Sequence, residues 1–164
     1  MKKFLRELLP YLIIVICVVL FRSYIATPAS VNGESMNDTL KNHDLVIINK
    51  IILNINDINR FDIVVLRNDF DNDRIIKRVI GLPNEKIEYK NNILYINDKE
   101  VKTNIKFENT EDFIAETSDN EYFVLGDNRD ISKDSRYLGN FNRSSIIGKV
   151  NFRFYPFDKI GFIE

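Results

Sequence analysis

Residues 86–97 read KIEYKNNILYIN, and this stretch predicts the fold class of the chain. Apolar and polar side chains alternate on both sides of Asn91-Asn92, which is the pattern of two β-strands that each bury one face. Asparagine tolerates positive φ better than most residues, so the Asn-Asn pair predicts a tight turn. The stretch therefore predicts an antiparallel β-hairpin.

The same pattern of short β-rich segments separated by Asn and Asp continues in both directions along the chain. The further expected strands are 44–50, 62–66, 75–80, 121–125 and 147–154. Segment 102–120 is polar and less patterned, and we expect a loop there. Few stretches after residue 26 show helical periodicity. These features predict a mostly β domain, a barrel or folded sheet without parallel strand–helix–strand units.

The N-terminus carries an apolar run, LLPYLIIVICVVLF, at residues 8–21. Extended to residue 26, it would form a helix of about 28 Å, which spans the core of a bilayer. Three basic residues precede the run and one, Arg22, follows it, so the N-terminus is expected in the cytoplasm. This divides the chain into a cytoplasmic end (1–7), a transmembrane helix (8–26) and an extracytoplasmic domain (27–164). The alternative is a signal peptide cleaved near Thr27-Pro28-Ala29.

Composition excludes several classes of function. Lys and Arg number 23 and Asp and Glu 24, a balance that argues against binding of nucleic acid through its phosphates. One cysteine, Cys17, and one histidine, His43, cannot form an internal disulfide or a usual zinc site. His43 lies in a polar stretch and is expected in an exposed loop. The base of a hydrolase would therefore not be histidine.

Three segments contain residues with catalytic chemistry. Residues 31–40 (VNGESMNDTL) place Ser35 just after a glycine, where an exposed turn could present a nucleophile beside free N–H groups. Residues 74–81 (RIIKRVIG) place Lys77 on an apolar strand face, where burial would lower its pKa and make it a base. Residues 126–136 (GDNRDISKDSR) alternate acids, arginines and hydroxyls after an apolar strand. Taken singly, these segments are also compatible with an ordinary turn, a snorkelling edge lysine and a solvated turn.

Together, the three segments resemble bacterial type I signal peptidase (leader peptidase) in its compact, Gram-positive-like form. The resemblance covers nearly the whole chain, and it implies one transmembrane helix followed by a β-barrel or folded-sheet catalytic domain that needs no cofactor. The residues that carry it are Gly33, Ser35, Met36, Thr39, Leu40, Asp62–Val65, Lys77–Pro83, Gly126–Asp130, Ser132 and Asp134–Arg136.

The resemblance implies a Ser/Lys dyad with Ser35 as nucleophile and Lys77 as general base. Ser132 would orient the lysine through a hydrogen bond. The further supporting residues that it implies are Arg78, Asp127 and an Asp134–Arg136 ion pair.

The resemblance also implies an oxyanion hole that uses the backbone N–H of Ser35. Some members add a serine hydroxyl two residues earlier, but this chain has Gly33 there, so the second donor would be backbone or water. A second departure is Asp38, which replaces the usual proline of the Met-x-Pro-Thr-Leu run.

The expected function is removal of signal peptides from exported preproteins at small-x-small sites, with the enzyme in the bilayer near the secretion translocon. An extended substrate would pair with strands at 31–35 and 75–77. The residues expected to line its shallow pockets are Val31, Met36, Leu40, Ile75 and Ile76. Two alternatives remain open: a Ser/Lys enzyme with another task, such as a self-cleaving repressor, and an inactive membrane-tethered β domain that binds exported proteins.

Overall fold

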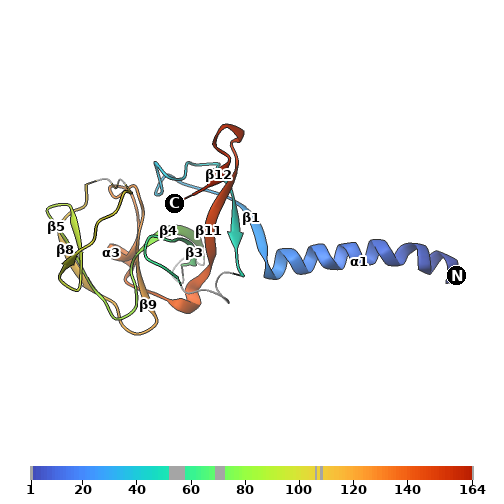
Figure 1. Cartoon of the computed structure of the whole chain (residues 1–164), viewed down its shortest axis with the longest axis horizontal. Helices are drawn as coiled ribbons and strands as arrows, with labels where there is room; N and C mark the ends of the chain where they lie inside the picture. The colour runs from blue at the N-terminus through green and yellow to red at the C-terminus, as the bar shows by residue number, and fades with distance from the viewer. Residues whose placement is uncertain (1, 52–57, 69–72, 106, 108, 164) are drawn as a thin grey trace.

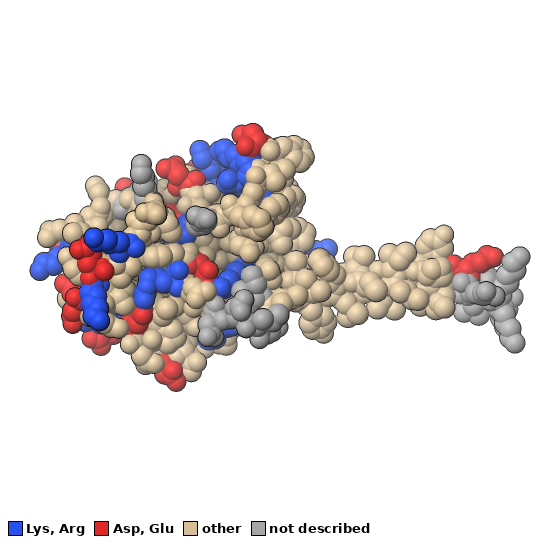
Figure 2. Space-filling view, viewed as in Figure 1, with Lys and Arg blue, Asp and Glu red and all other residues tan. Residues whose placement is uncertain are grey.

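The computed structural model describes residues 2–51, 58–68, 73–105, 107 and 109–163. One long helix, α1 (Lys2–Tyr24), projects from a β domain that contains the rest of the described chain (Figure 1). Its segment Glu7–Tyr24 is long and apolar enough to cross a membrane. Figure 2 shows that α1 presents neither acidic nor basic side chains along its middle, whereas both kinds cover the β domain. This charge distribution suits a membrane-embedded helix.

The helix is shorter at its C-terminal end than expected. It ends at Tyr24, and Ala26, expected in the helix, already belongs to strand β1 (Ala26–Ser30). Side chains of the domain bind the last carbonyl groups of α1: Thr27 Oγ1 donates to Arg22 O at 2.8 Å, and Lys50 Nζ donates to Ser23 O at 3.2 Å. These bonds satisfy carbonyl groups that a helix end leaves unpaired.

Two antiparallel sheets form the β domain. The large sheet has the order β1-β2-β11-β3-β4-β9-β10, and β12 pairs with β11. The small sheet has the order β7-β6-β5-β8. The remaining strands of the large sheet are β2 (Leu45–Asn49), β3 (Ile63–Arg67), β4 (Arg74–Gly81), β9 (Glu121–Leu125), β10 (Phe141–Asn142), β11 (Ile146–Tyr155) and β12 (Gly161–Phe162). The strands of the small sheet are β5 (Lys86–Lys90), β6 (Ile93–Ile96), β7 (Lys99–Glu100) and β8 (Phe113–Glu116).

Short helical turns complete the described elements. They are α3 (Ser135–Leu138), η1 (Arg143–Ser145) and η2 (Phe157–Lys159). The mostly β fold class predicted from the sequence is thus confirmed. The hairpin at 86–97 is also as predicted, with Asn91 and Asn92 both at positive φ (49° and 62°).

Three apolar clusters hold the domain together. The first packs β2, β3 and β11 against Val31, Met36 and Leu40 of the loop that carries Ser35. The second lies around β3, β4 and β9. The third joins the two sheets, because Ile87 and Tyr89 of the small sheet pack on Phe123 of β9. Burial of each such side chain stabilises the fold by about 1.5–3 kcal/mol.

One strand was not expected, and two expectations about strands are wrong. Residues 26–30 form the unexpected strand β1 although ATPAS lacks an alternating pattern; an edge position tolerates its proline. Residues 31–35, expected to be extended, form no strand: residues 33 and 34 bend, with Gly33 at φ +102°, and a turn begins at Ser35. Segment 102–120, expected to be a loop, contains β8, where Phe113 and Ala115 pack on the third cluster.

Candidate active site

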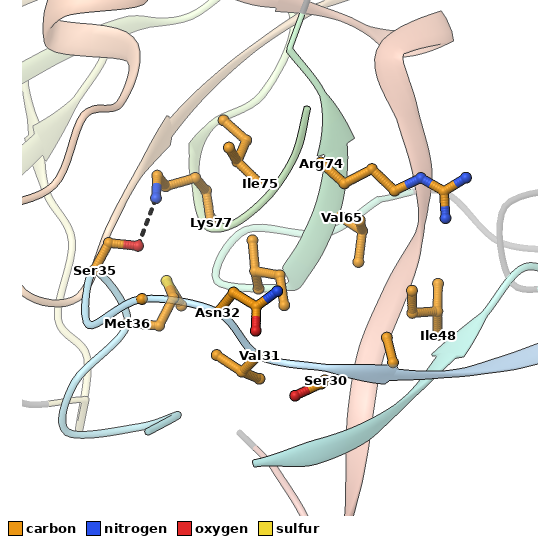
Figure 3. A pocket seen from close by; sticks show the side chains of 13 residues that line it. Ser30, Val31, Asn32, Ser35, Met36, Ile48, Val65, Arg74, Ile75 and Lys77 are labelled. Carbon is orange, nitrogen blue, oxygen red and sulfur yellow. Dashed lines mark hydrogen bonds between the residues drawn. The ribbon is translucent and has the colours of Figure 1, made fainter. Parts of the chain in front are cut away.

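The centre of the site is a contact between Ser35 and Lys77. Lys77 lies in the middle of β4 and is 3% exposed. Its Nζ donates a hydrogen bond of 2.7 Å to Ser35 Oγ (Figure 3). Buried Met36 and Leu40 pack on the first cluster and hold the loop of Ser35 in place. The two residues are 42 positions apart in the chain, so the fold creates their contact.

Burial changes the acid–base behaviour of Lys77. Desolvation lowers the pKa of its ammonium to about 8, against the attraction of Asp134 and Asp127, which raises it. About one-tenth of the molecules would therefore carry a neutral amine at pH 7. Such an amine can accept a proton from a hydroxyl group that lies at hydrogen-bond distance.

A buried ion pair lies behind the dyad. Arg78, next to Lys77 on β4, donates to Asp127 through Nε at 2.8 Å and Nη2 at 2.7 Å. Asp127 also accepts a hydrogen bond of 2.5 Å from Thr39 Oγ1. Asp127 therefore links β4 to the loop that carries Ser35.

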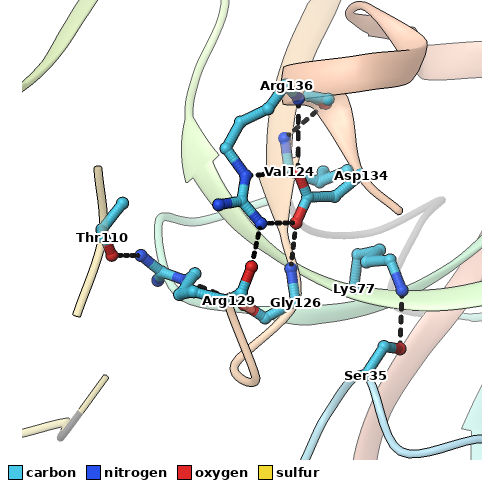
Figure 4. Close-up of polar contacts among 9 residues, drawn as sticks. Ser35, Lys77, Thr110, Val124, Gly126, Arg129, Asp134 and Arg136 are labelled. Carbon is cyan, nitrogen blue, oxygen red and sulfur yellow. Dashed lines mark hydrogen bonds and ion pairs between the residues drawn. The ribbon is translucent and has the colours of Figure 1, made fainter. Parts of the chain in front are cut away.

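The expected Asp134–Arg136 ion pair is present, with Arg136 Nε 2.9 Å from Asp134 Oδ1. Asp134 is fully buried and also accepts a hydrogen bond of 3.0 Å from Gly126 N (Figure 4). Arg136 Nη2 in turn donates to Arg129 O at 2.6 Å. These bonds fix the two ends of loop 126–136 to each other.

The expected hydrogen bond between Ser132 and Lys77 is not formed. Ser132 Oγ is buried and has no hydrogen-bond partner within the described part of the chain, whereas Lys77 Nζ donates to Ser35 Oγ. Ser132 lies against Gly126: a methyl group on Gly126 would come within 2.5 Å of Ser132 Cβ and would also overlap Ser35 O. Glycine at 126 therefore allows Ser35 and Ser132 to lie this close to the start of the loop.

Gly33 does not supply the second oxyanion donor in this structure, because its N–H donates to Asn42 Oδ1 at 3.0 Å. For the Ser35 N–H, no acceptor is recorded among the described residues. Ser35 O accepts a hydrogen bond of 3.1 Å from Asn128 N, which turns the Ser35 peptide towards loop 126–136. The Ser35 N–H is thus the backbone donor available beside the nucleophile.

A pocket of about 260 Å³ opens beside the dyad (Figure 3). Four of the five expected lining residues line it: Val31, Met36, Ile75 and Ile76. The fifth expectation, Leu40, is wrong, because this side chain is fully buried in the first cluster and does not reach the pocket. Ile48, Val65 and Arg74 line it as well and were missed. Ile48 and Val65 belong to β2 and β3, and no local sequence signal connects them with Ser35. Arg74 begins β4, next to the expected residues Ile75 and Ile76.

Comparisons with known proteins agree with this geometry. Residues 4–155 match the family model described as "Signal peptidase, peptidase S26". The chain belongs to this family. Signal peptidase IB of Staphylococcus aureus (strain Mu50) is 37% identical, over 94% of this chain and 93% of that protein. Signal peptidase I of Bacillus caldolyticus is 38% identical, over 93% of this chain and 92% of that protein.

A solved signal peptidase I from Enterococcus faecalis V583 has a similar fold, with a TM-score of 0.51 and 35% identity over 57% of this chain and 96% of that chain. The resemblance seen in the motifs is thus confirmed. The protein is a membrane-anchored serine peptidase that removes signal peptides from exported preproteins.

Proposed function

We propose that this signal peptidase cleaves through a dyad of Ser35 and neutral Lys77. Lys77 Nζ accepts the proton of Ser35 Oγ as Oγ attacks the scissile carbonyl carbon. When the tetrahedral intermediate collapses, the new ammonium gives this proton to the leaving amine, and an acyl-enzyme remains. Water then attacks the ester, with Lys77 again as base, and releases the signal peptide. The 2.7 Å Ser35–Lys77 contact is the observation that supports this assignment.

The oxyanion of each tetrahedral intermediate would be bound by the Ser35 N–H, for which no acceptor is recorded among the described residues. One such donor typically contributes about 10²–10³ in rate. Ser132, Asp127, Arg78, Asp134 and Arg136 would act behind the dyad, by shaping the loop that covers Lys77. A second oxyanion donor would be a substrate-ordered water, because the Gly33 amide is already bonded.

The substrate would bind as an extended peptide between β1 and β4, both of which contribute residues to the pocket. Val31 and Met36 form one wall with Ile76, and Ile75 packs towards the second cluster on the opposite face of β4. Branched side chains leave room for alanine, glycine or serine and exclude larger groups. Cleavage would therefore follow small-x-small sequences.

We also infer the membrane topology: residues 1–7 in the cytoplasm, the span within α1, and the β domain outside, near the translocon that delivers preproteins. The support is the excess of basic residues before the apolar run. Attachment to the bilayer that holds the signal peptide raises the effective concentration of substrate.

The test is cleavage of a preprotein with an Ala-x-Ala site by purified full-length enzyme in lipid. Ser35→Ala and Lys77→Ala should each abolish cleavage, while the matched surface variants Ser118→Ala and Lys90→Ala should cleave normally. Substantial activity in folded Lys77→Ala enzyme would exclude Lys77 as the base. A wild-type enzyme that leaves the preprotein uncut would contradict the proposal as a whole.

A further inference from the structure

Arg129 is a buried cation that the dyad chemistry does not use. Its side chain is 2% exposed, and no carboxylate within the described part of the chain forms an ion pair with it. Its guanidinium lies over the rings of Phe107 (4.4 Å) and Tyr89 (5.3 Å). Tyr89 belongs to β5 of the small sheet, and Phe107 packs on the third cluster. Burial of a charge costs free energy unless contacts compensate for it. The two rings provide part of this compensation, and hydrogen bonds from Nε and Nη1 add to it, whereas Nη2 is buried without a hydrogen-bond partner within the described part of the chain.

The hydrogen bonds of Arg129 connect two parts of the molecule. Nη1 donates to Thr110 Oγ1 at 2.6 Å, in the segment between β7 and β8. Nε donates to Gly126 O at 2.8 Å, at the start of loop 126–136 (Figure 4). The planar guanidinium group of Arg129 thus connects the small-sheet side of the domain with loop 126–136, called the catalytic loop below, and fixes the distance between them.

The loop position held by Arg129 touches the nucleophile. Gly126 lies so close to Ser35 O that a Cβ there would overlap it, and Asn128 N donates to the same oxygen at 3.1 Å. Gly126 N is held from the other side by Asp134, whose partner Arg136 also binds Arg129 O. Displacement of Arg129 would therefore move the peptide of Ser35.

We propose that Arg129 is a positioning residue, through which Thr110, Tyr89 and Phe107 of the small-sheet side fix the catalytic loop against Ser35. The small sheet contributes no residue to the dyad. It affects catalysis through the contacts of Arg129, which hold the catalytic loop in the position that Ser35 requires. The proposal deepens the proposed function and rests on it, because the effect is measured as signal-peptide cleavage.

The pH dependence of kcat/KM distinguishes a positioning role of Arg129 from a role in stability alone. Lys77 is bonded to Ser35 on one side. The carboxylates of Asp134 and Asp127 in loop 126–136 raise its pKa by electrostatic attraction, and each of these carboxylates is paired with an arginine. If the loop loosens, water reaches Lys77, and its pKa rises from about 8 towards the ordinary value of 10.5. The alkaline midpoint of activity should then move up.

The experiment measures kcat/KM for preprotein cleavage from pH 6.5 to 10, together with thermal unfolding, on full-length enzyme in lipid. Arg129→Met should lower the rate at pH 8 by about tenfold to a hundredfold and move the midpoint to higher pH, because misplacement by about 1 Å can cost a hundredfold. Thr110→Val should act in the same direction with a smaller effect, and Thr110→Ser, which keeps the hydroxyl, should restore the wild-type profile.

The matched control is Arg60→Met. Arg60 also binds a backbone carbonyl, Ile80 O at 2.6 Å, and pairs with Glu85, but it does not touch the catalytic loop. This variant should lower the unfolding temperature and leave the pH midpoint of activity unchanged.

The proposal is overturned if folded Arg129→Met keeps the wild-type rate and midpoint, or if Arg60→Met shifts the midpoint equally. If Arg129→Met does not fold, Thr110→Val and Thr110→Ser decide: the proposal is overturned if Thr110→Val keeps the wild-type rate and midpoint. Failure of the proposed function would be recognised separately, because the wild-type enzyme would then not cleave the preprotein.

Discussion

Substitution of Gly126 by alanine tests how tightly the two serines and the catalytic loop fit together. The new Cβ would lie 2.5 Å from Ser132 Cβ and would also overlap Ser132 Oγ and Ser35 O. Ordinary contact begins at about 3.4 Å, so residue 126 and the two serines must move apart by about 1 Å. Overpacking of this kind costs about 1–3 kcal/mol of stability.

The effect on catalysis should exceed the effect on folding. A displacement of about 1 Å at a reacting group can lower the rate about a hundredfold, which corresponds to about 2.7 kcal/mol of transition-state stabilisation. We therefore expect Gly126→Ala to fold with a lowered unfolding temperature and to lose about two orders of magnitude in kcat/KM for a preprotein substrate. Both quantities are measured on the same enzyme preparation in lipid.

Gly81→Ala is the matched control. Its Cβ would lie 2.6 Å from Ile87 Cδ1, between the two sheets, and it would not touch Ser35 or Lys77. It should lose similar stability and keep most of its kcat/KM. Wild-type activity in Gly126→Ala, or an equal loss of activity in Gly81→Ala, would refute the reasoning from packing.

Three further predictions follow from the ion pair, the pocket and the anchor. Asp127→Asn removes the carboxylate charge that pairs with buried Arg78 and should lower the free energy of unfolding by about 3–5 kcal/mol, measured by denaturant titration. Ile76→Ala enlarges the pocket and should admit a bulkier residue in a library of cleavage sites; an unchanged profile would remove Ile76 from the specificity pocket. Protease added to intact spheroplasts should digest residues 27–164, whereas protection, or a mature N-terminus near Thr27, would contradict the topology.

Most of the fold could be predicted because alternation is a local property of the sequence. The hairpin at 86–97 and β2 alternate between more buried and less buried residues, and their bounds were predicted within two residues. Strands β3 and β9 bury nearly every residue and were recognised as short apolar runs, within one residue of their observed bounds. Strand β1 could not be predicted in this way. Its sequence ATPAS has no alternation, and it is a strand because β2 pairs with it along five residues.

The site residues likewise include some that local motifs reveal and others whose contacts depend on the fold. Ser35, Lys77 and the loop 126–136 could be recognised from motifs, and the structure brings them together. The bond expected from Ser132 and the place expected for Leu40 were wrong, because both depend on side-chain direction within a packed core. The contacts of Arg129 with Thr110 and Phe107 join distant segments, and no short motif contains that information.

The central claim is that neutral Lys77 activates Ser35, and the pH dependence of kcat/KM tests it most directly. The active form is the deprotonated one, so activity must rise with pH through the lowered pKa of about 8. On a preprotein substrate, the rate should rise about tenfold per pH unit below pH 7, reach half its maximum at about pH 8 and level off at higher pH. A profile that is flat from pH 6 to 9, or that has its maximum near pH 5, would contradict the assignment of Lys77 as the base.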